Sequence, residues 1–160
     1  MLRIGEAEYQ ELRRHGEETY PHESCGMLMG RAEGEERVVA QVARCGNTRA
    51  DSPHNRYGID PREILRLQRQ GRERGEDIVG FYHSHPDHPA YWSSTDLAEA
   101  HWVGCSYVIT SVARGKAEAT NSFLLVGCEA GDEGGEPAKA FRDEELRVTR
   151  RGGLSPLEAE

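Results

Sequence analysis

The sequence predicts one α/β domain, a sandwich built around a largely central β-sheet. The chain has 160 residues, which is enough for one buried core and too few for two well-stabilised ones. Segments with strand character alternate with segments with helix character along most of its length. The element order is too irregular for a doubly wound nucleotide-binding fold, and neither G-x-G-x-x-G nor G-x-x-x-x-G-K-S/T occurs.

The N-terminal part of the chain predicts a helix followed by two strands. Residues 6–20 are charged, with a few apolar positions, and predict a surface helix that Pro21 ends. A short apolar run bounded by glycines, residues 23–30, predicts a buried strand. Residues 37–44 are rich in valine and predict the next strand, with residues 32–35 as the turn between them.

The next element has the clearest start signal in the chain. Asp60 has the character of an N-cap and Pro61 that of a first helical residue, and Gly71 or Gly75 ends the predicted helix. The remaining predicted elements are a strand at 77–85, a short helix at 94–102, strands at 106–112 and 121–127, and one last strand between 138 and 148. This order of elements favours a sheet with helices packed against it.

Composition and charge exclude several classes of protein. The formal net charge of −8 argues against nonspecific binding to nucleic acid or to anionic membranes. No apolar run approaches the roughly 20 residues of a membrane-spanning helix, and the first residues lack the apolar core of a signal peptide. We therefore expect a cytoplasmic protein, with residues 1–149 as one domain and 150–160 as a mobile C-terminal tail.

The four cysteines are widely scattered and contain no C-x-x-C pair. In a reducing compartment each is expected to be a small buried hydrophobic residue. They are Cys25, Cys45, Cys105 and Cys128. Cys25 is the one whose position leaves a chemical role open.

The residues that carry chemistry are concentrated at the end of the strand predicted at 77–85. Residues two apart in a strand point to the same face, so His83 and His85 can present two imidazoles to one point. Asp96 falls in the first turn of the next predicted helix, where the helix dipole favours a carboxylate. Two imidazoles and one carboxylate leave the fourth tetrahedral position of Zn²⁺ open, which is typical of a catalytic zinc site.

Each part of this pattern also has a purely structural interpretation. A His-x-His on a strand is more often incidental than metal-binding, and Ser93-x-x-Asp96 is an ordinary capping box. The conjunction nevertheless favours a metal. Both histidines follow directly from an apolar strand, and the loop after them is short enough to bring Asp96 back at a helix start.

The same residues resemble the signature of the JAMM (MPN-plus) metallopeptidases: a distant Glu, then His-x-His, seven residues, Ser, two residues and Asp. The positions are filled here by Glu23, His83, His85, Ser93 and Asp96. The resemblance covers roughly residues 1 to 125 and is greatest to the small, stand-alone bacterial members. It also includes Asn47, Arg56-Tyr57, Asp60-Pro61 and Gly80-Phe81-Tyr82.

The resemblance implies a three-layer sandwich of the cytidine-deaminase-like type, with a central mixed β-sheet flanked by helices and with Zn²⁺ as cofactor. His83, His85 and Asp96 would bind the zinc. Glu23 would act as general base and then as general acid. Ser93 would donate a hydrogen bond to the oxyanion of the tetrahedral intermediate. Ser84, between the two histidines, is expected to point to the opposite face and to be structural.

The family hydrolyses amide bonds at the C-terminal Gly-Gly of ubiquitin or ubiquitin-like proteins, and a slot that admits only glycine gives specificity by exclusion. Deubiquitinating members of the family carry sizeable insertions that grip ubiquitin, whereas here only a short stretch separates Asp96 from the strand at Ser106. The resemblance to the small members therefore implies a small β-grasp sulfur-carrier protein as substrate. The bond cleaved would be either an isopeptide bond or the amide bond to a C-terminal amino-acid adduct such as cysteine.

Two alternatives remain at this point, a non-catalytic MPN interaction scaffold and a RadC-like DNA-associated protein. The complete ligand set disfavours the scaffold. The acidic charge and the lack of a helix-hairpin-helix segment disfavour the DNA-associated protein.

Overall fold

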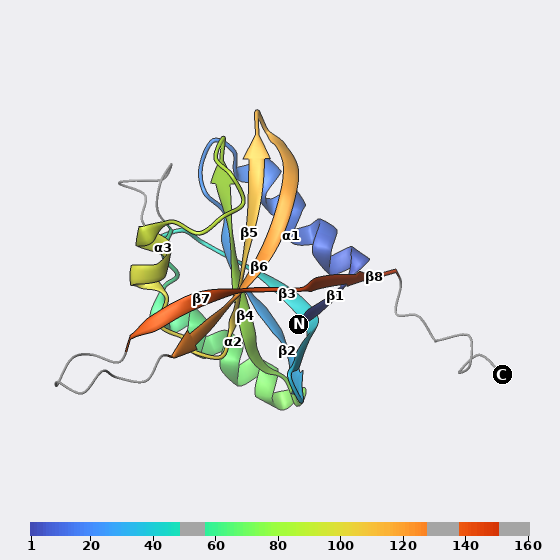
Figure 1. Ribbon diagram of the computed structural model, residues 1–160. Coiled ribbons are helices and arrows are strands. Elements are labelled where there is room, and N and C mark those ends of the chain that lie inside the picture. Colours follow the sequence, from blue (N-terminus) through green and yellow to red (C-terminus); the bar gives the residue numbers. More distant parts are fainter. Residues whose placement is uncertain (49–56, 128–137, 151–160) are drawn as a thin grey trace.

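The structure is a computed structural model that describes residues 1–48, 57–127 and 138–150. Within these ranges, eight strands form one sheet and three helices pack against it (Figure 1). The strands are β1 (Leu2–Gly5), β2 (Cys25–Glu33), β3 (Glu36–Cys45), β4 (Asp77–Pro86), β5 (Ser106–Ala113), β6 (Lys116–Gly127), β7 (Lys139–Glu144) and β8 (Leu146–Thr149). The helices are α1 (Glu6–Thr19), α2 (Pro61–Glu73) and α3 (Ser94–Glu99).

The sheet is mixed and strongly curled. Its strand order is β7-β6-β5-β4-β2-β3-β1-β8, with parallel pairing of β4 with β5 and of β1 with both of its neighbours. Only Glu145 separates β7 from β8, yet the two strands pair at opposite ends of this order. The sheet therefore curls until this one segment, the orange-to-red band of Figure 1, bridges its two edges.

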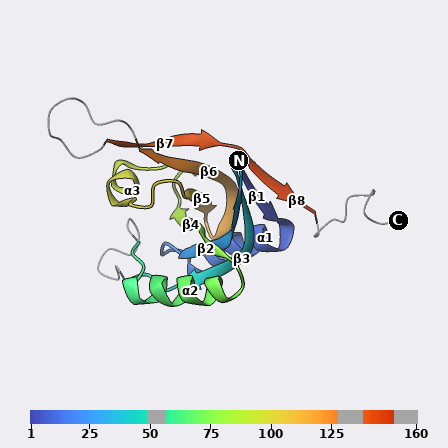
Figure 2. The same ribbon diagram turned by 90° about the horizontal axis from the view of Figure 1, so that it is seen from below.

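Alternating side chains give the sheet two apolar faces. Leu28 of β2 faces a core formed with Leu12 of α1, whereas its neighbour Met27 faces a core to which α2 and α3 contribute. The helices thus lie on both sides of the sheet, as Figure 2 shows for α2 below the strands. Burying one such side chain contributes about 1.5–3 kcal/mol. The predicted three-layer sandwich with a central mixed sheet is confirmed.

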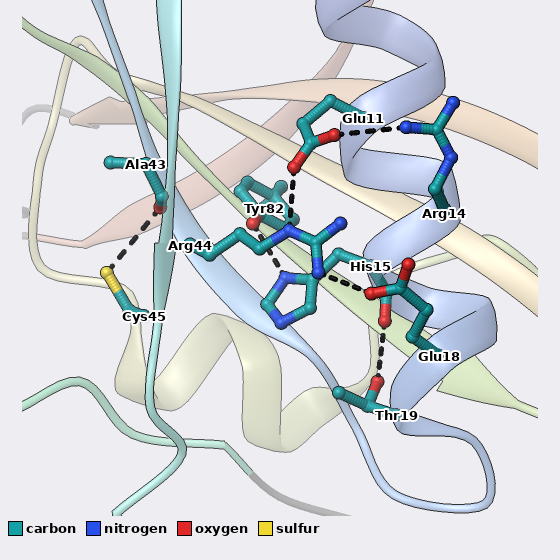
Figure 3. Close-up of polar contacts among 9 residues, drawn as sticks. All are labelled: Glu11, Arg14, His15, Glu18, Thr19, Ala43, Arg44, Cys45 and Tyr82. Carbon is teal, nitrogen blue, oxygen red and sulfur yellow. Dashed lines mark hydrogen bonds and ion pairs between the residues drawn. The ribbon is translucent and has the colours of Figure 1, made fainter.

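Polar contacts fix α1 on its face of the sheet (Figure 3). Arg44 of β3 donates to the carboxylates of Glu11 and Glu18 on α1. Deeper in the interface, the buried ring of His15 hydrogen-bonds through Nδ1 to the hydroxyl of Tyr82 on β4, at 2.8 Å. Because exposed ion pairs contribute little, the buried contact and the apolar core carry most of the attachment.

A part-buried ion pair joins strands across the curl. Glu144 of β7 accepts hydrogen bonds from Arg37 of β3 at 2.6 Å and from the hydroxyl of Ser122 at 2.7 Å. Arg37 also donates to Ser106 at 2.8 Å. Burial opposes ionisation of Glu144, but these donors outweigh it and lower its pKa. The pair therefore holds together strands that the sequence places more than a hundred residues apart.

Most predicted elements agree with the observed ones to within a few residues, and the exceptions are short or exposed. No strand was predicted at β1, whose four residues give only two apolar positions. Strand β6 begins at Lys116 rather than at 121. The prediction missed its first half because those residues are largely exposed and polar. Helix α3 ends at Glu99 rather than at 102. The last predicted strand is two strands, β7 and β8, on opposite sheet edges.

Two further predictions concern the four cysteines and the C-terminal tail. Cys25, Cys45 and Cys105 are buried, as predicted, and Cys128 lies outside the described residues. The division into a domain of 1–149 and a tail of 150–160 stays a prediction, since 151–160 also lie outside them. In the part of the chain that the structure describes, no helix is long and apolar enough to cross a membrane.

Candidate metal centre

The end of β4 places two imidazoles side by side in the protein interior. His83 and His85 are 2% and 8% exposed and point to the face of the sheet that carries α2 and α3. Their strand lies between β2 and β5, where His83 is opposite Cys25 on one side and Ile109 on the other. Because the strand is held on both sides, the backbone at the two histidines is fixed.

The loop after His85 is fastened to the neighbouring strands. The N–H of Asp87 donates to the carbonyl of Val112 at 2.7 Å, and Asp87 adopts a φ of 56°, which aspartate tolerates better than most residues. The hydroxyl of Ser111 donates to the carbonyl of His88 at 2.7 Å. The amide of Asn121 donates to the carbonyl of Ala90 at 2.9 Å. These bonds fix the path of the chain to α3, which carries Asp96.

Ser93 and Asp96 form a capping box at the start of α3. The hydroxyl of Ser93 accepts from the N–H of Asp96 at 3.1 Å, and Asp96 Oδ2 accepts from the N–H of Ser93 at 2.9 Å. The structural role considered for both residues is therefore present. It does not use the O–H proton of Ser93, which remains available to an acceptor in the adjoining cleft.

The three side chains converge on one point. His85 Nε2 lies 3.1 Å from Asp96 Oδ2, His83 Nε2 lies 3.3 Å from Asp96 Oδ1, and the two Nε2 atoms are 3.0 Å apart. One ligand atom from each residue lies within 4.8 Å of the others. These donor atoms, two imidazole nitrogens and a carboxylate, are ones that Zn²⁺ accepts.

The hydrogen bonding around His85 fits a metal. Its Nδ1 donates to the carbonyl of Pro89 at 2.9 Å, which makes Nε2 the unprotonated nitrogen of a neutral ring. That lone pair then faces both another imidazole nitrogen and a carboxylate. Lone pairs and negative charge directed at one buried point repel one another, and a cation at that point would offset the repulsion.

The pKa directions show the same crowding. Burial lowers the pKa of His83, despite its contact with Asp96. Burial also disfavours the charged form of His85, but contacts with Asp96 and Pro89 outweigh it and raise its pKa. Burial opposes ionisation of Asp96 as well, and its contacts with the two imidazoles hold its pKa far below the usual range. The carboxylate is therefore charged, as a ligand must be.

Tyr57 is a neighbour of the site to which the sequence assigned no role. Its ring stacks on that of His83, with centroids 4.3 Å apart and planes 21° apart. Among the described residues, Nδ1 of His83 has no hydrogen-bond partner, so packing against Tyr57 orients this ring. Arg56-Tyr57 is part of the resemblance to the JAMM family, and this was the only signal in the sequence for a role of Tyr57 at the site.

Glu23 lies just before β2, beside the cluster. It is 5% exposed, and its Oε2 has no hydrogen-bond partner within the described part of the chain. Together with His85 and Ser93 it lines a cleft of about 400 Å³. Burial raises the pKa of Glu23 to about 8, with His85 opposing and Asp96 adding to the effect. Its carboxyl group can therefore gain and lose a proton near neutral pH.

Cys25 adjoins Glu23 but does not have the properties of a nucleophile. It is fully buried, and burial raises the pKa of its thiol well above the usual range. A reactive cysteine needs a thiolate and access to its partner. The expectation of a structural Cys25 fits the site.

Three relatives with described activities share about a third of their aligned residues with this chain. Desampylase of Haloferax volcanii is 37% identical over 91 residues, which are 57% of this chain and 63% of that protein. A probable TtuB-protein conjugate cleaving protease of Thermus thermophilus is 33% identical, over 72% of this chain and 70% of that one. The CysO-cysteine peptidase of Mycobacterium tuberculosis is 30% identical, over 70% and 74%. The chain thus matches less than two thirds of the desampylase.

Solved structures share the fold. A protein from Desulfitobacterium hafniense is 30% identical and covers 94% of each chain, with a TM-score of 0.77. A JAB1/MPN domain protein from Archaeoglobus fulgidus, 15% identical with a TM-score of 0.53, shows the fold alone. The family profile described as prokaryotic homologs of the JAB domain matches residues 5–126. The family expected from the sequence is confirmed: the chain belongs to the prokaryotic JAB-domain (JAMM-type) proteins.

Proposed function

We propose that this protein is a zinc metallopeptidase that hydrolyses the amide bond after the C-terminal Gly-Gly of a small ubiquitin-like or sulfur-carrier protein. The observation that carries the proposal is the convergence of His83, His85 and Asp96 beside the buried carboxyl group of Glu23. Support for the substrate class comes from the relatives, whose names describe release of such proteins from conjugates or from cysteine.

The zinc ligands are His83 and His85, through Nε2, and the carboxylate of Asp96. When bound, Zn²⁺ lowers the pKa of a coordinated water and polarises the substrate carbonyl. The carbonyl of Pro89 holds the ring of His85 in the required tautomer. Three protein ligands are the number that leaves a position for chemistry.

Glu23 is the proton-transferring group. As a carboxylate it takes a proton from the attacking water, and as a carboxylic acid it gives that proton to the nitrogen of the leaving amine, so the proton count balances over one turnover. A carboxyl group with a pKa of about 8 is neutral at pH 7, and a cation at the cluster favours its charged form. A bound metal would therefore favour the carboxylate form of Glu23 that the first proton transfer needs.

Ser93 supplies the hydrogen bond to the oxyanion. Its hydroxyl lines the same cleft as Glu23 and has a proton that the capping box leaves unused. A donor held in place before reaction stabilises developing charge without reorganisation. Placed together on one cleft, Ser93 and Glu23 act on the oxygen and the nitrogen of the same amide.

The cleft also bears on the choice of substrate. Besides the reacting groups, its walls include the aromatic residues Tyr91 and Trp92 together with Pro89. We propose that these bulky side chains leave space for an extended glycine segment and disfavour branched side chains. The leaving group is either a lysine or protein amine or a single amino acid such as cysteine.

A cleavage assay on three substrates tests the proposal: a sulfur-carrier protein with a C-terminal cysteine, a linear ubiquitin-like fusion, and an isopeptide conjugate. We expect about one zinc per chain and chelator-sensitive cleavage of at least one substrate. His85→Ala should lose both zinc and activity. A protein that holds no zinc and cleaves none would instead be a scaffold, and one that binds DNA at moderate salt would support a RadC-like role.

A further inference from the structure

Backbone contacts at and beside Glu23 limit where its carboxyl group can lie, since its Oε2 has no hydrogen-bond partner among the described residues. The carbonyl of Glu23 accepts a hydrogen bond from the side-chain amide of Asn47 at 3.4 Å. The next residue, Ser24, makes three such contacts, all with Ser84 of β4. Its N–H donates to Ser84 Oγ at 2.8 Å, its hydroxyl donates to the same atom at 3.0 Å, and its carbonyl accepts from the N–H of Ser84 at 3.2 Å.

These contacts continue the β2–β4 ladder beyond its last regular pair. That pair is Cys25 with His83, and Ser24 and Glu23 lie just before the first residue of β2. There the hydroxyl of Ser84 takes the N–H of Ser24, the position a carbonyl would occupy in a regular ladder. Both serines are 1–2% exposed, so the bonds are shielded from water.

Helix α1 closes over this pair from behind. A Cβ atom on Gly16 would lie 3.2 Å from Cβ of Ser84 and 3.0 Å from Val112, so a side chain there would require these neighbours to move by a few tenths of an ångström. The preceding helical residue, His15, is bonded to Tyr82 of the same strand (Figure 3). The helix therefore packs on Tyr82 and Ser84, two successive residues of β4 on the face that α1 covers.

We infer that Ser84 is a positioning residue: its hydroxyl, through the backbone of Ser24, fixes Glu23 relative to the metal ligands. The inference rests on the function proposed above. The alternation of β4 directs His83 and His85 to the metal and Ser84 to the opposite face. One three-residue segment thereby holds both the metal ligands and the residue next to the general base.

Ser84→Ala is the direct test. It leaves the buried N–H of Ser24 without a partner, so the segment must shift to satisfy it. A displacement of about 1 Å at a catalytic group lowers turnover by about 100-fold, and we expect kcat to fall about 10- to 100-fold. Zinc content should not change, because the three ligands keep their positions, and KM should change little, because Glu23 is only one of the residues that line the substrate cleft.

Two matched variants separate positioning from stability. Ser24→Ala removes one hydroxyl but keeps the N–H bond to Ser84, so it should lower kcat much less than Ser84→Ala. Thr110→Val removes a buried hydroxyl next to Ser84 on β5, where Thr110 bonds to Thr120 at 3.0 Å and not to the Glu23 segment. It should leave kcat unchanged even where its melting temperature falls as far as that of Ser84→Ala.

Two readouts complete the test. In a double-mutant cycle, Ser84→Ala should have no further effect on kcat in the Glu23→Gln background, because the serine acts only through the glutamate. In the metal-free protein, amide exchange at Ser24 should become about tenfold faster or more in Ser84→Ala and should not change in Thr110→Val. The exchange measurement needs no activity, so it tests the structural step even if the proposed function fails.

The inference is overturned by unchanged exchange at Ser24 in Ser84→Ala, or by a kcat per bound zinc equal to wild type. An additive double-mutant cycle overturns it as well. Failure of the proposed function looks different: the wild-type protein would then hold no zinc, or Glu23→Gln would keep full activity.

Discussion

Replacing Ser93 by alanine removes two interactions whose sizes differ enough to be told apart. The first is the cap, in which the hydroxyl accepts from the N–H of Asp96 at 3.1 Å. Its loss costs about 1 kcal/mol, roughly a factor of five in an equilibrium constant. The reciprocal bond, from the N–H of Ser93 to the carboxylate of Asp96, uses the backbone and survives. Zinc binding should therefore persist.

The second interaction is the hydrogen bond that we propose Ser93 donates to the oxyanion. Loss of one such donor lowers kcat by about 10²–10³, or about 3–4 kcal/mol of activation free energy. That is far more than the cap can explain. Ser93→Ala should accordingly hold zinc like the wild type, melt slightly earlier, and turn over at least about 100 times more slowly.

Ser93→Gly and Ser93→Thr serve as controls. Glycine is nearly as good an N-cap as serine, within a few tenths of a kcal/mol, but has no hydroxyl. Threonine keeps both the cap and the donor. Steady-state kinetics on the best substrate, with metal analysis of each sample, should place glycine with alanine and threonine with serine. If glycine retains wild-type activity and alanine loses it, Ser93 acts through the helix cap, and its assignment to the oxyanion is wrong.

Three further predictions follow, two on stability and one on zinc affinity. Glu144→Gln should lower the free energy of unfolding by about 1.5–3 kcal/mol, because it removes the negative charge to which part-buried Arg37 donates. Since the folded-state pKa of Glu144 is lowered, its contribution to stability is present above the unfolded value of about 4.5 and is lost as pH falls through the folded pKa. In urea titrations, the free energy of unfolding should therefore differ less between pH 7 and pH 3 for the variant than for the wild type. Gly16→Ala should lower the free energy of unfolding by about 1 kcal/mol in the same titrations, because crowding against Val112 and Ser84 outweighs the better helix propensity of alanine; an unchanged midpoint would contradict that packing. Lys139 donates to the carbonyls of Ala98 and Ala100 at the end of α3, the helix that carries Asp96. Lys139→Met should therefore lower zinc affinity modestly in a chelator competition. An affinity equal to wild type would show that this end of α3 does not influence the metal site.

Local signals in the sequence predicted those parts of the fold that depend on local chemistry. The N-cap at Asp60 and the proline after it define the start of α2, and the aspartate accepts from the N–H of Arg62 as a cap should. The alternation of β4 correctly placed Ser84 on the face opposite the two histidines. In each case neighbouring residues decide the outcome.

Long-range pairing could not be predicted in the same way. The chain passes at Glu145 from one sheet edge to the other, because β8 pairs with β1, which lies more than a hundred residues earlier in the sequence. Nothing in the composition of residues 139–149 indicates this change of edge. The stacking of Tyr57 on His83 and the bond from Ser24 to Ser84 are likewise products of tertiary packing. Spacing alone therefore indicated the ligand set but not the groups that hold it.

The central claim is a zinc-bound site in which Glu23 transfers the proton. The most direct measurement compares wild type and Glu23→Gln for zinc content and for single-turnover cleavage of a sulfur-carrier protein with a C-terminal cysteine. The account predicts about one zinc per chain in both proteins, with turnover in the variant lowered by at least about 10²-fold. Full activity in Glu23→Gln, or cleavage by wild-type protein that holds no metal, would contradict it.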